Sequence, residues 1–280
     1  MKTIKTLLAT IALLLCSETM NAHDFEVDGI YYNILSENNK TVEVTFKGDT
    51  YSSKANEYTD SITIPQKVDY EGNEYAVTRI GTEAFRGCFK LLSVNIPNGV
   101  VTIGQQAFGG CQKLTSVAIP EGVTSIGNYT FQDCTSLTSV VIPEGVTSIG
   151  NYTFYGCSSL ASVVIPEGVT SIGERAFSGC KSLTSVKSLS SEEPEIYTIG
   201  GSTFGSISKN AILYIPEGAS YPNWEPYFSK VEYLTEEEIT GIEDVMPEVR
   251  KSVIYDINGL RVKDPVKGGI YIIDGEKVKL

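Results

Sequence analysis

The sequence predicts an elongated solenoid, in which one short unit is wound repeatedly around a continuous apolar core. A unit of 23 residues recurs between Ile80 and Val186, with the order Ile-Gly-x3-Phe-x2-Cys-x2-Leu-x2-Val-x-Ile-Pro-x-Gly-Val. Two of its positions return at the same step in five successive units: Cys88, Cys111, Cys134, Cys157 and Cys180, and Phe85, Phe108, Phe131, Phe154 and Phe177. A period of this length with fixed apolar positions indicates units that bury their apolar faces only against their neighbours.

Each unit contains one short strand that the sequence marks clearly. In the segment 137–142, Leu137, Val140 and Ile142 are expected to face inward, with the strand at 140–142. Pro143 ends this strand because proline lacks the donor that a strand ladder needs. The Phe and Cys segment is too short for a long helix. We therefore expect parallel strands on one face and turns, or short 3₁₀ or helical segments, on the other.

The first 22 residues have the pattern of an export signal. Lys2 and Lys5 precede an apolar run from Leu7 to Leu15, which is too short to span a bilayer, and cleavage is expected after Ala22. Attachment of a lipid at Cys16 is the alternative, although Leu15 is bulkier than the small residue that usually precedes such a site. The chain is therefore expected to be exported.

Residues 23–61 are expected to cap the first coil with β-structure. Val27–Leu35 and Thr41–Phe46 are rich in β-branched and aromatic residues, and the segment 36–40 between them forms a turn. A solenoid needs such a cap because its end would otherwise expose apolar surface and strand edges. Ile62–Pro65 then begins the solenoid with half a unit, and an inserted hairpin follows with Gly72-Asn73 as its turn.

The solenoid is expected to end at residue 234. The fifth unit departs from the pattern, with Ser188 in place of isoleucine and Leu189 in place of proline, and a last strand follows at 213–215. Trp224, Tyr227 and Phe228 are predicted to cover the last coil. Residues 235–251 are acidic and are interpreted as a linker. Residues 252–280 form a small β module, because Asn258-Gly259 and Asp274-Gly275 lie between β-rich runs.

Composition excludes several classes of function. The formal net charge of −12 opposes binding to phosphate backbones, so we expect no nucleic-acid partner. The chain has one histidine, His23, and no Cys-x2-Cys pair, which argues against a metal site. Cysteines of stacked coils lie about 4.8 Å or more apart, whereas a disulfide needs Cβ atoms at roughly 3.5–4.5 Å. The repeated cysteines are therefore predicted to form a column of buried thiols.

The repeat resembles the BspA-like leucine-rich repeat family. The unit with Ile103-Gly104, Ala107-Phe108, Gly110-Cys111 and Ile119-Pro120 carries the resemblance most fully, and it extends over residues 62–228. It implies a secreted or surface protein that binds macromolecules, with no shared catalytic residues. The segment from Tyr255 to Lys277 resembles the C-terminal sorting tails of type IX secretion substrates. That likeness implies transfer to the outer surface of a Gram-negative bacterium.

Two surfaces are candidates for binding. On the strand face, a row of serines runs beside a row that is apolar at its centre, and the two rows contain Ser93, Ser116, Ser139, Ser162 and Ser185, and Asn95, Ala118, Val141, Val164 and Lys187. On another side, Tyr129, Tyr152 and Tyr155 are expected to lie close together, because the first two are one unit apart. For the strand-face rows, the alternative interpretation is that small residues allow the strands to pack. For the tyrosines, the alternative is ordinary stacking of surface side chains. Asn128-Tyr-Thr130 and Asn151-Tyr-Thr153 have the form of glycosylation acceptors and are interpreted as products of the repeat.

The sequence therefore predicts a non-catalytic, surface-displayed binding protein, monomeric and without a cofactor, metal ion or transmembrane segment. Its expected partner is a protein, either of the host matrix or of another cell surface. A structural spacer without a dedicated ligand and a carbohydrate-binding accessory protein are the alternatives.

Overall fold

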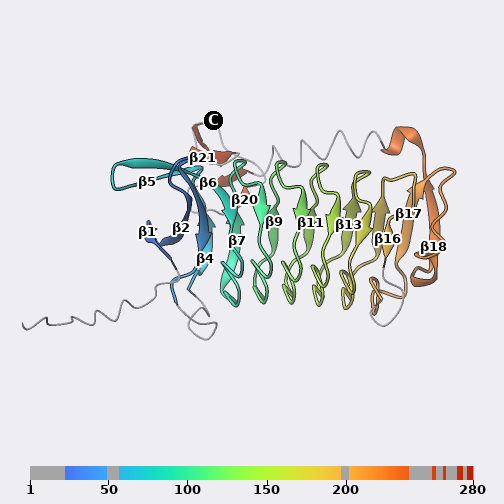
Figure 1. Ribbon diagram of the computed structural model, residues 1–280. Helices are drawn as coiled ribbons and strands as arrows, with labels where there is room; N and C mark the ends of the chain where they lie inside the picture. The colour runs from blue at the N-terminus through green and yellow to red at the C-terminus, as the bar shows by residue number, and fades with distance from the viewer. Residues whose placement is uncertain are drawn as a thin grey trace, which may run out of the picture.

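The computed structural model describes residues 23–48, 57–196 and 202–239, together with the backbone of four strands between residues 254 and 279. The predicted signal segment, with Cys16, and most of the predicted linker lie outside the described residues. The repeated units form a row of coils that lie side by side between a cap of strands at the N-terminal end and the strands labelled β17 and β18 (Figure 1). The predicted solenoid is thus confirmed.

The seven predicted strands of the strand face are all present and parallel. They are β4 (Asp60–Thr63), β7 (Leu91–Asn95), β9 (Ser116–Ala118), β11 (Ser139–Val141), β13 (Ser162–Ile165), β15 (Ser185–Ser188) and β17 (Ile212–Pro216), and β18 (Lys230–Leu234) adds an eighth. Equivalent residues pair from coil to coil, as Val94 does with Val117 and Val163 with Val186. Hydrogen bonding divides them into two sheets of four, with the break between β11 and β13.

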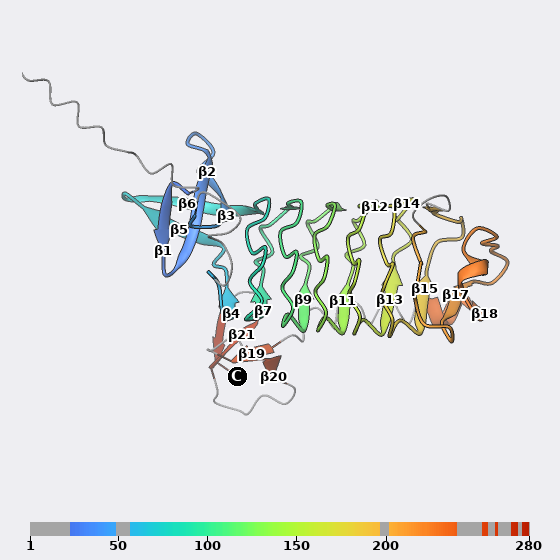
Figure 2. The same cartoon turned by 90° about the horizontal axis from the view of Figure 1, so that it is seen from below.

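The opposite face carries a second parallel sheet, which the sequence did not predict. Five two-residue strands form it: β8 (Thr102–Ile103), β10 (Ser125–Ile126), β12 (Ser148–Ile149), β14 (Ser171–Ile172) and β16 (Glu195–Ile196). The two sets of strands run along opposite sides of the solenoid (Figure 2). In these two-residue strands the isoleucine faces the core and the other side chain faces outward. Ile126, Ile149 and Ile172, for example, are buried.

The Phe and Cys segments are successive turns rather than helices. In one coil, the Gly109 N–H donates to the Gln106 carbonyl and the Cys111 N–H donates to the Phe108 carbonyl. Gln106 and Gly110 have φ angles of 55° and 76°, which lie in the left-handed region and interrupt any helix. Of the predicted alternatives, turns or short 3₁₀ or helical segments, the structure has turns, because the chain reverses twice within a few residues.

The core consists of continuous columns of identical side chains. The rings of the five repeated phenylalanines and Phe204 stack with centroid distances from 5.1 to 5.6 Å. Beside them runs the thiol column, which is made of Cys88, Cys111, Cys134, Cys157 and Cys180, all buried, and no disulfide joins any of these five. From Cys111 onward, each Sγ donates a hydrogen bond to the carbonyl of a phenylalanine in the preceding coil, at 3.0–3.2 Å. The predicted column of buried thiols is confirmed.

The N-terminal cap is a mixed sheet with one strand more than predicted. Its strands are β1 (Phe25–Val27), β2 (Ile30–Ser36), β3 (Thr41–Thr45), β5 (Lys67–Tyr70) and β6 (Asn73–Ile80), and β6 also pairs with β8, so that the cap joins the second sheet. The turn of the inserted hairpin is Glu71-Gly72 rather than the predicted Gly72-Asn73, because Tyr70 pairs with Asn73. Both turn residues have positive φ, as a type I′ turn requires.

Two buried tyrosines of the cap have different hydrogen-bonding environments, so we expect substitution by phenylalanine to change the free energy of unfolding differently at each. The Tyr58 hydroxyl accepts a hydrogen bond from the Tyr31 N–H and donates one to the Thr45 carbonyl. The Tyr32 hydroxyl is buried and has no partner within the described residues. We expect Tyr58→Phe to lower the free energy of unfolding by about 1–3 kcal/mol, because it leaves buried polar groups unsatisfied. Tyr32→Phe should leave it unchanged or raise it by up to about 1 kcal/mol.

The midpoint of urea unfolding measures this comparison directly. Equal losses of stability in the two variants would contradict the assignment of a structural hydrogen bond to Tyr58 alone.

At the other end, aromatic side chains cover the last coil as predicted. Trp224 is fully buried, and Trp224 and Phe228 contact the ring of Phe204 at centroid distances of 5.1 and 5.2 Å. A 3₁₀ turn, η1 (Glu225–Tyr227), holds this segment. The buried hydroxyl of Ser188, which stands where other units carry isoleucine, pairs with the Tyr221 hydroxyl at 2.9 Å. The end cap therefore compensates for the irregular fifth unit.

Two segments follow the solenoid. Residues 236–239, inside the predicted linker, are helical, and Thr235 and Glu238 satisfy each other's backbone N–H groups as a capping box. The strands β19 (Ile254–Asp256), β20 (Arg261–Val262), β21 (Ile270–Ile273) and β22 (Glu276–Lys279) form an antiparallel sheet, with the two predicted hairpins as β19–β20 and β21–β22. In the described part of the chain, no helix has the length and apolar character needed to cross a bilayer.

Candidate functional site

The candidate sites are surfaces of the solenoid. Across residues 23–48, 57–196 and 202–239, no group of three or more His, Cys, Asp or Glu side chains is arranged to hold a metal ion. The nucleophilic side chains of the core are the thiols, and burial raises the pKa of Cys111, Cys134 and Cys157 well above the ordinary range. Protonated and buried thiols of this kind do not act as nucleophiles.

The strand face differs from the predicted exposed stripe at two places. Asn95 is 9% exposed, so that it is buried although it lies on the outward row. Val141 and Val164 are half-buried, because they pack against Leu189 and Leu234 of the same chain. Among the row of serines, Ser139 and Ser162 are exposed. The centre of the apolar stripe is therefore partly covered by the protein itself.

The three predicted tyrosines do lie together, and we call this set, Tyr129, Tyr152 and Tyr155, the tyrosine ridge. The rings of Tyr129 and Tyr152 stack at 4.9 Å with an angle of 13° between their planes, and Tyr155 tilts against Tyr152 at 5.5 Å. The guanidinium of Arg175 lies 5.8 Å from the centroid of the Tyr152 ring. Each ring is half-buried. The prediction that these residues form one cluster is confirmed.

Hydrogen bonding fixes the orientation of the ridge. The Tyr152 hydroxyl donates to Glu174 Oε1 at 3.1 Å. Desolvation and then this hydrogen bond raise the pKa of Tyr152, so its hydroxyl stays protonated. Tyr129 and Tyr152 have φ angles of 59° and 56°, in the left-handed region that costs a bulky residue roughly 1–2 kcal/mol. Strained positions that persist in a structure are candidates for function.

The same backbone position is strained in five successive units, but its side chain changes from coil to coil. Its occupants are Glu83, Gln106, Tyr129, Tyr152 and Arg175, each with a positive φ. Along one row, the units therefore keep the backbone constant and vary the side chain. Variation at a rigidly held position is what a recognition surface requires.

The residues before Tyr129 and Tyr152, Asn128 and Asn151, form an asparagine column of their own. Asn128 Oδ1 accepts a hydrogen bond from the Asn151 N–H, and Asn151 Oδ1 accepts one from the Glu174 N–H, each at 2.8 Å. Thr130 and Thr153 donate to the carbonyls of Gly127 and Gly150. The Asn-Tyr-Thr triplets thus join successive coils, which supports their interpretation as products of the repeat.

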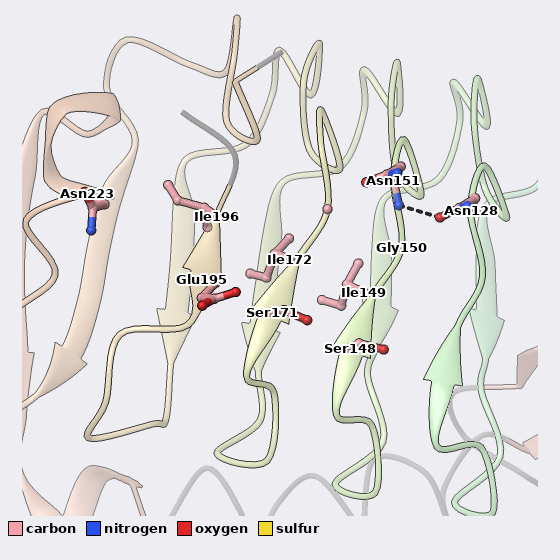
Figure 3. Close-up of a pocket in the computed structure, with 11 residues that line it drawn as sticks. Asn128, Ser148, Ile149, Gly150, Asn151, Ser171, Ile172, Glu195, Ile196 and Asn223 are labelled. Carbon is pink, nitrogen blue, oxygen red and sulfur yellow. Dashed lines mark hydrogen bonds between the residues drawn. The ribbon is translucent and has the colours of Figure 1, made fainter. Parts of the chain in front are cut away.

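A hollow with a volume of about 860 Å³ lies on the second sheet, next to the asparagine column (Figure 3). Its floor is formed by strands β12, β14 and β16, from which Ser148, Ser171 and Glu195 face outward. Asn128 and Asn151 line one side, and Asn223 lies at one end. This hollow was not predicted from the sequence, because the second sheet was not predicted. The recurring Ser-Ile pairs at 125–126, 148–149 and 171–172 were the available signal.

Comparison with known protein families agrees with this architecture. Residues 78–211 match the family described as BspA type leucine rich repeat region, in six copies. Residues 78–211 of this chain are a BspA-type leucine-rich repeat region. A comparison with curated protein sequences gives no significant match.

Solved structures of other leucine-rich repeat proteins resemble this chain over about three quarters of its length. A leucine-rich repeat protein from Bacteroides ovatus is 31% identical with a TM-score of 0.53, over 75% of this chain and 53% of its own. The present chain thus spans about half the length of that relative. The leucine rich repeat protein of T. pallidum is 26% identical with a TM-score of 0.52, over 76% and 83% of the two chains. A leucine rich cell surface protein from Faecalibacterium prausnitzii is 23% identical with a TM-score of 0.40, over 75% and 76%.

In this leucine-rich repeat protein, the residues that define the family and those available for binding are separate. The repeated Phe, Cys, Leu and Ile side chains are buried in the columns of the core. The tyrosine ridge and the outward residues of the second sheet lie at positions where the units differ or carry small polar residues. Any selectivity of this protein must therefore come from the second group.

Proposed function

We propose that this leucine-rich repeat protein is a non-catalytic binding protein displayed on the cell surface, and that its ligand is another protein that contacts the tyrosine ridge. The observation that carries the proposal is the stacked pair Tyr129 and Tyr152, held at 4.9 Å on a strained but rigid backbone, with Arg175 beside it. Tyrosine and arginine are enriched among the residues that dominate protein–protein binding energy. Side chains that are already fixed lose little entropy on binding.

The geometry of the ridge favours a protein over a sugar as its ligand. The faces of Tyr129 and Tyr152 cover each other, and Arg175 lies over the ring of Tyr152. A sugar that stacks on an aromatic ring needs an open ring face, and the ring of Tyr152 at the centre of the ridge is contacted by both Tyr129 and Arg175. Ring edges and hydroxyl groups lie beside the guanidinium of Arg175, which pairs with Glu174 at 3.9 Å, and such groups suit the mixed polar and apolar surface of a protein.

Binding to a panel of immobilised extracellular-matrix proteins tests the proposal. We expect the full chain to bind at least one of them, and Tyr129→Ala with Tyr152→Ala to weaken that binding by roughly tenfold or more, the loss expected when a hot spot is truncated. Ser139→Glu with Ser162→Glu on the strand face is the control, because these exposed serines can change without loss of packing.

Loss of binding in the strand-face control, with the ridge variant unaffected, would assign the site to the strand face instead. If no matrix protein binds, the spacer role predicted as an alternative is favoured.

Surface display in a Gram-negative bacterium is also part of the proposal, and it rests on the signal-like segment at 1–22 and the sorting-like segment at 252–280. Deletion of residues 252–280 should retain the protein in the periplasm. Protease accessibility on intact cells measures this, and undiminished surface exposure of the truncated chain would remove the sorting role.

A further inference from the structure

The strand face ends in a strand whose outer edge is open. β18 is the last strand at the end of the solenoid opposite the N-terminal cap (Figure 1). It pairs with β17 along its whole length, from Lys230 with Ile212 to Leu234 with Pro216, and with no other strand that the structure describes. An open edge of this kind is a template on which a further strand can pair.

Hydrogen bonding shows which backbone groups of β18 face this edge. The Glu217 N–H donates to the Leu234 carbonyl at 2.9 Å, so Leu234 turns its backbone groups toward β17. Successive residues of a strand turn theirs to opposite sides. The N–H and C=O groups of Val231 and Tyr233 therefore point to the open edge, and within residues 23–48, 57–196 and 202–239 no other residue bonds to them there.

The chain on either side of β18 leaves the edge uncovered. Before it, the aromatic segment that covers the last coil is held to the preceding coil, since Trp224 Nε1 donates to the Pro194 carbonyl. After it, the chain turns back over the strand face, where Ile239 joins a small apolar cluster. Tyr233 stays 58% exposed, more than any other large hydrophobic side chain that the structure describes. A neighbouring strand would cover this ring.

The charges of β18 make its edge complementary to itself. Lys230 Nζ pairs with Glu232 Oε1, so the two side chains lie on the same side of the strand, and both are exposed. Charges on an edge strand, those of lysine above all, commonly keep other strands away. One lysine and one glutamate two residues apart have the opposite effect on a second copy in the reverse orientation, because each charge can then meet its opposite.

One register of two antiparallel copies satisfies both the backbone and the charges. Val231 and Tyr233 carry the free groups, so the paired residues must come from these two positions. A pair of strands centred on Glu232 sets two carboxylates directly opposite each other, and one centred on Tyr233 sets no charged residue of one β18 opposite a charged residue of the other. A pair centred on Val231 sets each Lys230 opposite the partner's Glu232, which is favourable twice over.

We propose that two copies of this chain associate through the open edge of β18, antiparallel and centred on Val231. The N–H and C=O groups of the two Val231 residues bond to each other, and each Lys230 faces the partner's Glu232. The sheet of β13, β15, β17 and β18 then continues into its counterpart, four strands from each copy. A dimer thus replaces the monomer expected from the sequence. The contact is separate from the tyrosine ridge, and it stands whether or not the ridge binds a protein.

Sedimentation velocity of the full chain at increasing concentration tests the proposal. One pair of strands buries less surface than a standard interface, so we expect a dissociation constant between about 1 μM and about 1 mM. Lys230→Glu and Glu232→Lys each set like charges opposite one another, and each alone should weaken association by about tenfold or more. Lys113→Glu makes the same change of charge at an exposed position of a middle coil and should leave association unchanged.

Two combinations of these variants test the register. The chain with both changes, Lys230→Glu and Glu232→Lys, again sets opposite charges face to face and should associate as the unchanged chain does. An equimolar mixture of the two single variants should form heterodimers at a concentration at which neither variant dimerises by itself. In that mixture every charged pair across the contact joins a lysine to a glutamate.

Tyr233→Pro blocks the contact without a change of charge. Its ring replaces an N–H that points to the open edge, where proline is tolerated, so pairing with β17 is kept and a second copy is excluded. We expect this variant to be monomeric, with an unchanged far-UV circular dichroism spectrum. If it unfolds, the charge variants, which keep every backbone group, decide the outcome. Tyr129→Ala with Tyr152→Ala should dimerise normally, which separates this contact from the ridge.

A chain that stays monomeric up to about 1 mM would overturn the proposal. So would a dimer that the single charge changes leave intact, or a double change that fails to restore association. Binding of the neutral strand-forming peptide Thr-Val-Thr-Val-Thr-Val to a monomeric chain, lost in Tyr233→Pro, would also overturn it, because the edge would then accept a strand of another protein rather than a second copy.

Discussion

Raising the pH above about 8.5 should unfold this protein within one or two pH units, because the thiol column cannot ionise inside the core. Burial raises the pKa of Cys111, Cys134 and Cys157 well above the ordinary value, and that of Cys180 to about 12. An unfolded thiol has a pKa of about 8.5. As the pH rises between these values, the unfolded chain loses protons that the folded chain keeps, so stability is complete below about pH 8.5 and falls above it.

The free energy of unfolding is expected to fall steeply as the pH rises. Each such thiol lowers the free energy of unfolding by about 1.4 kcal/mol per pH unit, and four together by about 5.5 kcal/mol per pH unit. A domain with a typical stability of about 5–15 kcal/mol would thus unfold near pH 10. Urea unfolding measured at intervals from pH 7 to pH 10 gives the slope.

A double substitution within the thiol column is the control for this pH dependence of stability. Cys134→Ala with Cys157→Ala lowers stability at neutral pH through lost packing, but the slope above pH 8.5 should fall by about half, because two of four ionisable groups are gone. A free energy of unfolding that is constant from pH 8 to pH 10 would contradict the burial of the column.

Replacing Gly173 with alanine should destabilise the protein by about 3 kcal/mol or more. A Cβ atom at this position would lie 2.5 Å from both the backbone N and the Oδ1 of Asn151 in the preceding coil. These atoms are backbone or are held by the hydrogen bond to the Glu174 N–H, so they cannot move away without separating two coils. Overpacking of a rigid core costs typically 1–3 kcal/mol and sometimes more.

The equivalent glycine two coils earlier is a matched control. At Gly127 the added Cβ would meet its nearest neighbours, Gln105 N, Ile103 O and Thr130 Oγ1, at 3.4 Å, close to ordinary contact. Gly127→Ala should therefore change the free energy of unfolding by less than about 1 kcal/mol. Equal losses for Gly127→Ala and Gly173→Ala, compared by urea unfolding, would show that the asparagine column does not restrict this position.

The features that could be predicted from the sequence are those that the repeat itself encodes. A strict period fixes which residues stack, so the columns of Phe85 to Phe177 and Cys88 to Cys180 and the strand at each Val-x-Ile followed from spacing alone. The clustering of Tyr129, Tyr152 and Tyr155 followed in the same way. Trp224 was predicted as a cover because an exposed last coil would leave apolar surface in water.

The rest depends on backbone conformations that the residue types do not reveal. Gln106, Tyr129 and Tyr152 have positive φ although none is glycine, so no sequence signal separated these turns from the short helical segments that were the other predicted possibility. A strand of two residues, such as Ser148–Ile149, is too short to show alternation, and the second sheet with its hollow was missed. The partial cover over Val141 and Val164 comes from Leu189 and Leu234, which are remote in sequence.

Counting reactive thiols tests the central claim, that the repeats stack into one continuous core, most directly. A chain carrying Cys16→Ser keeps the five cysteines of the thiol column. With Ellman's reagent and no reductant, we predict that none of the five reacts in the folded protein at pH 8, and that all five react together once urea unfolds it. Rapid reaction of thiols in the folded protein, or fewer than five after unfolding, would contradict the stacked arrangement.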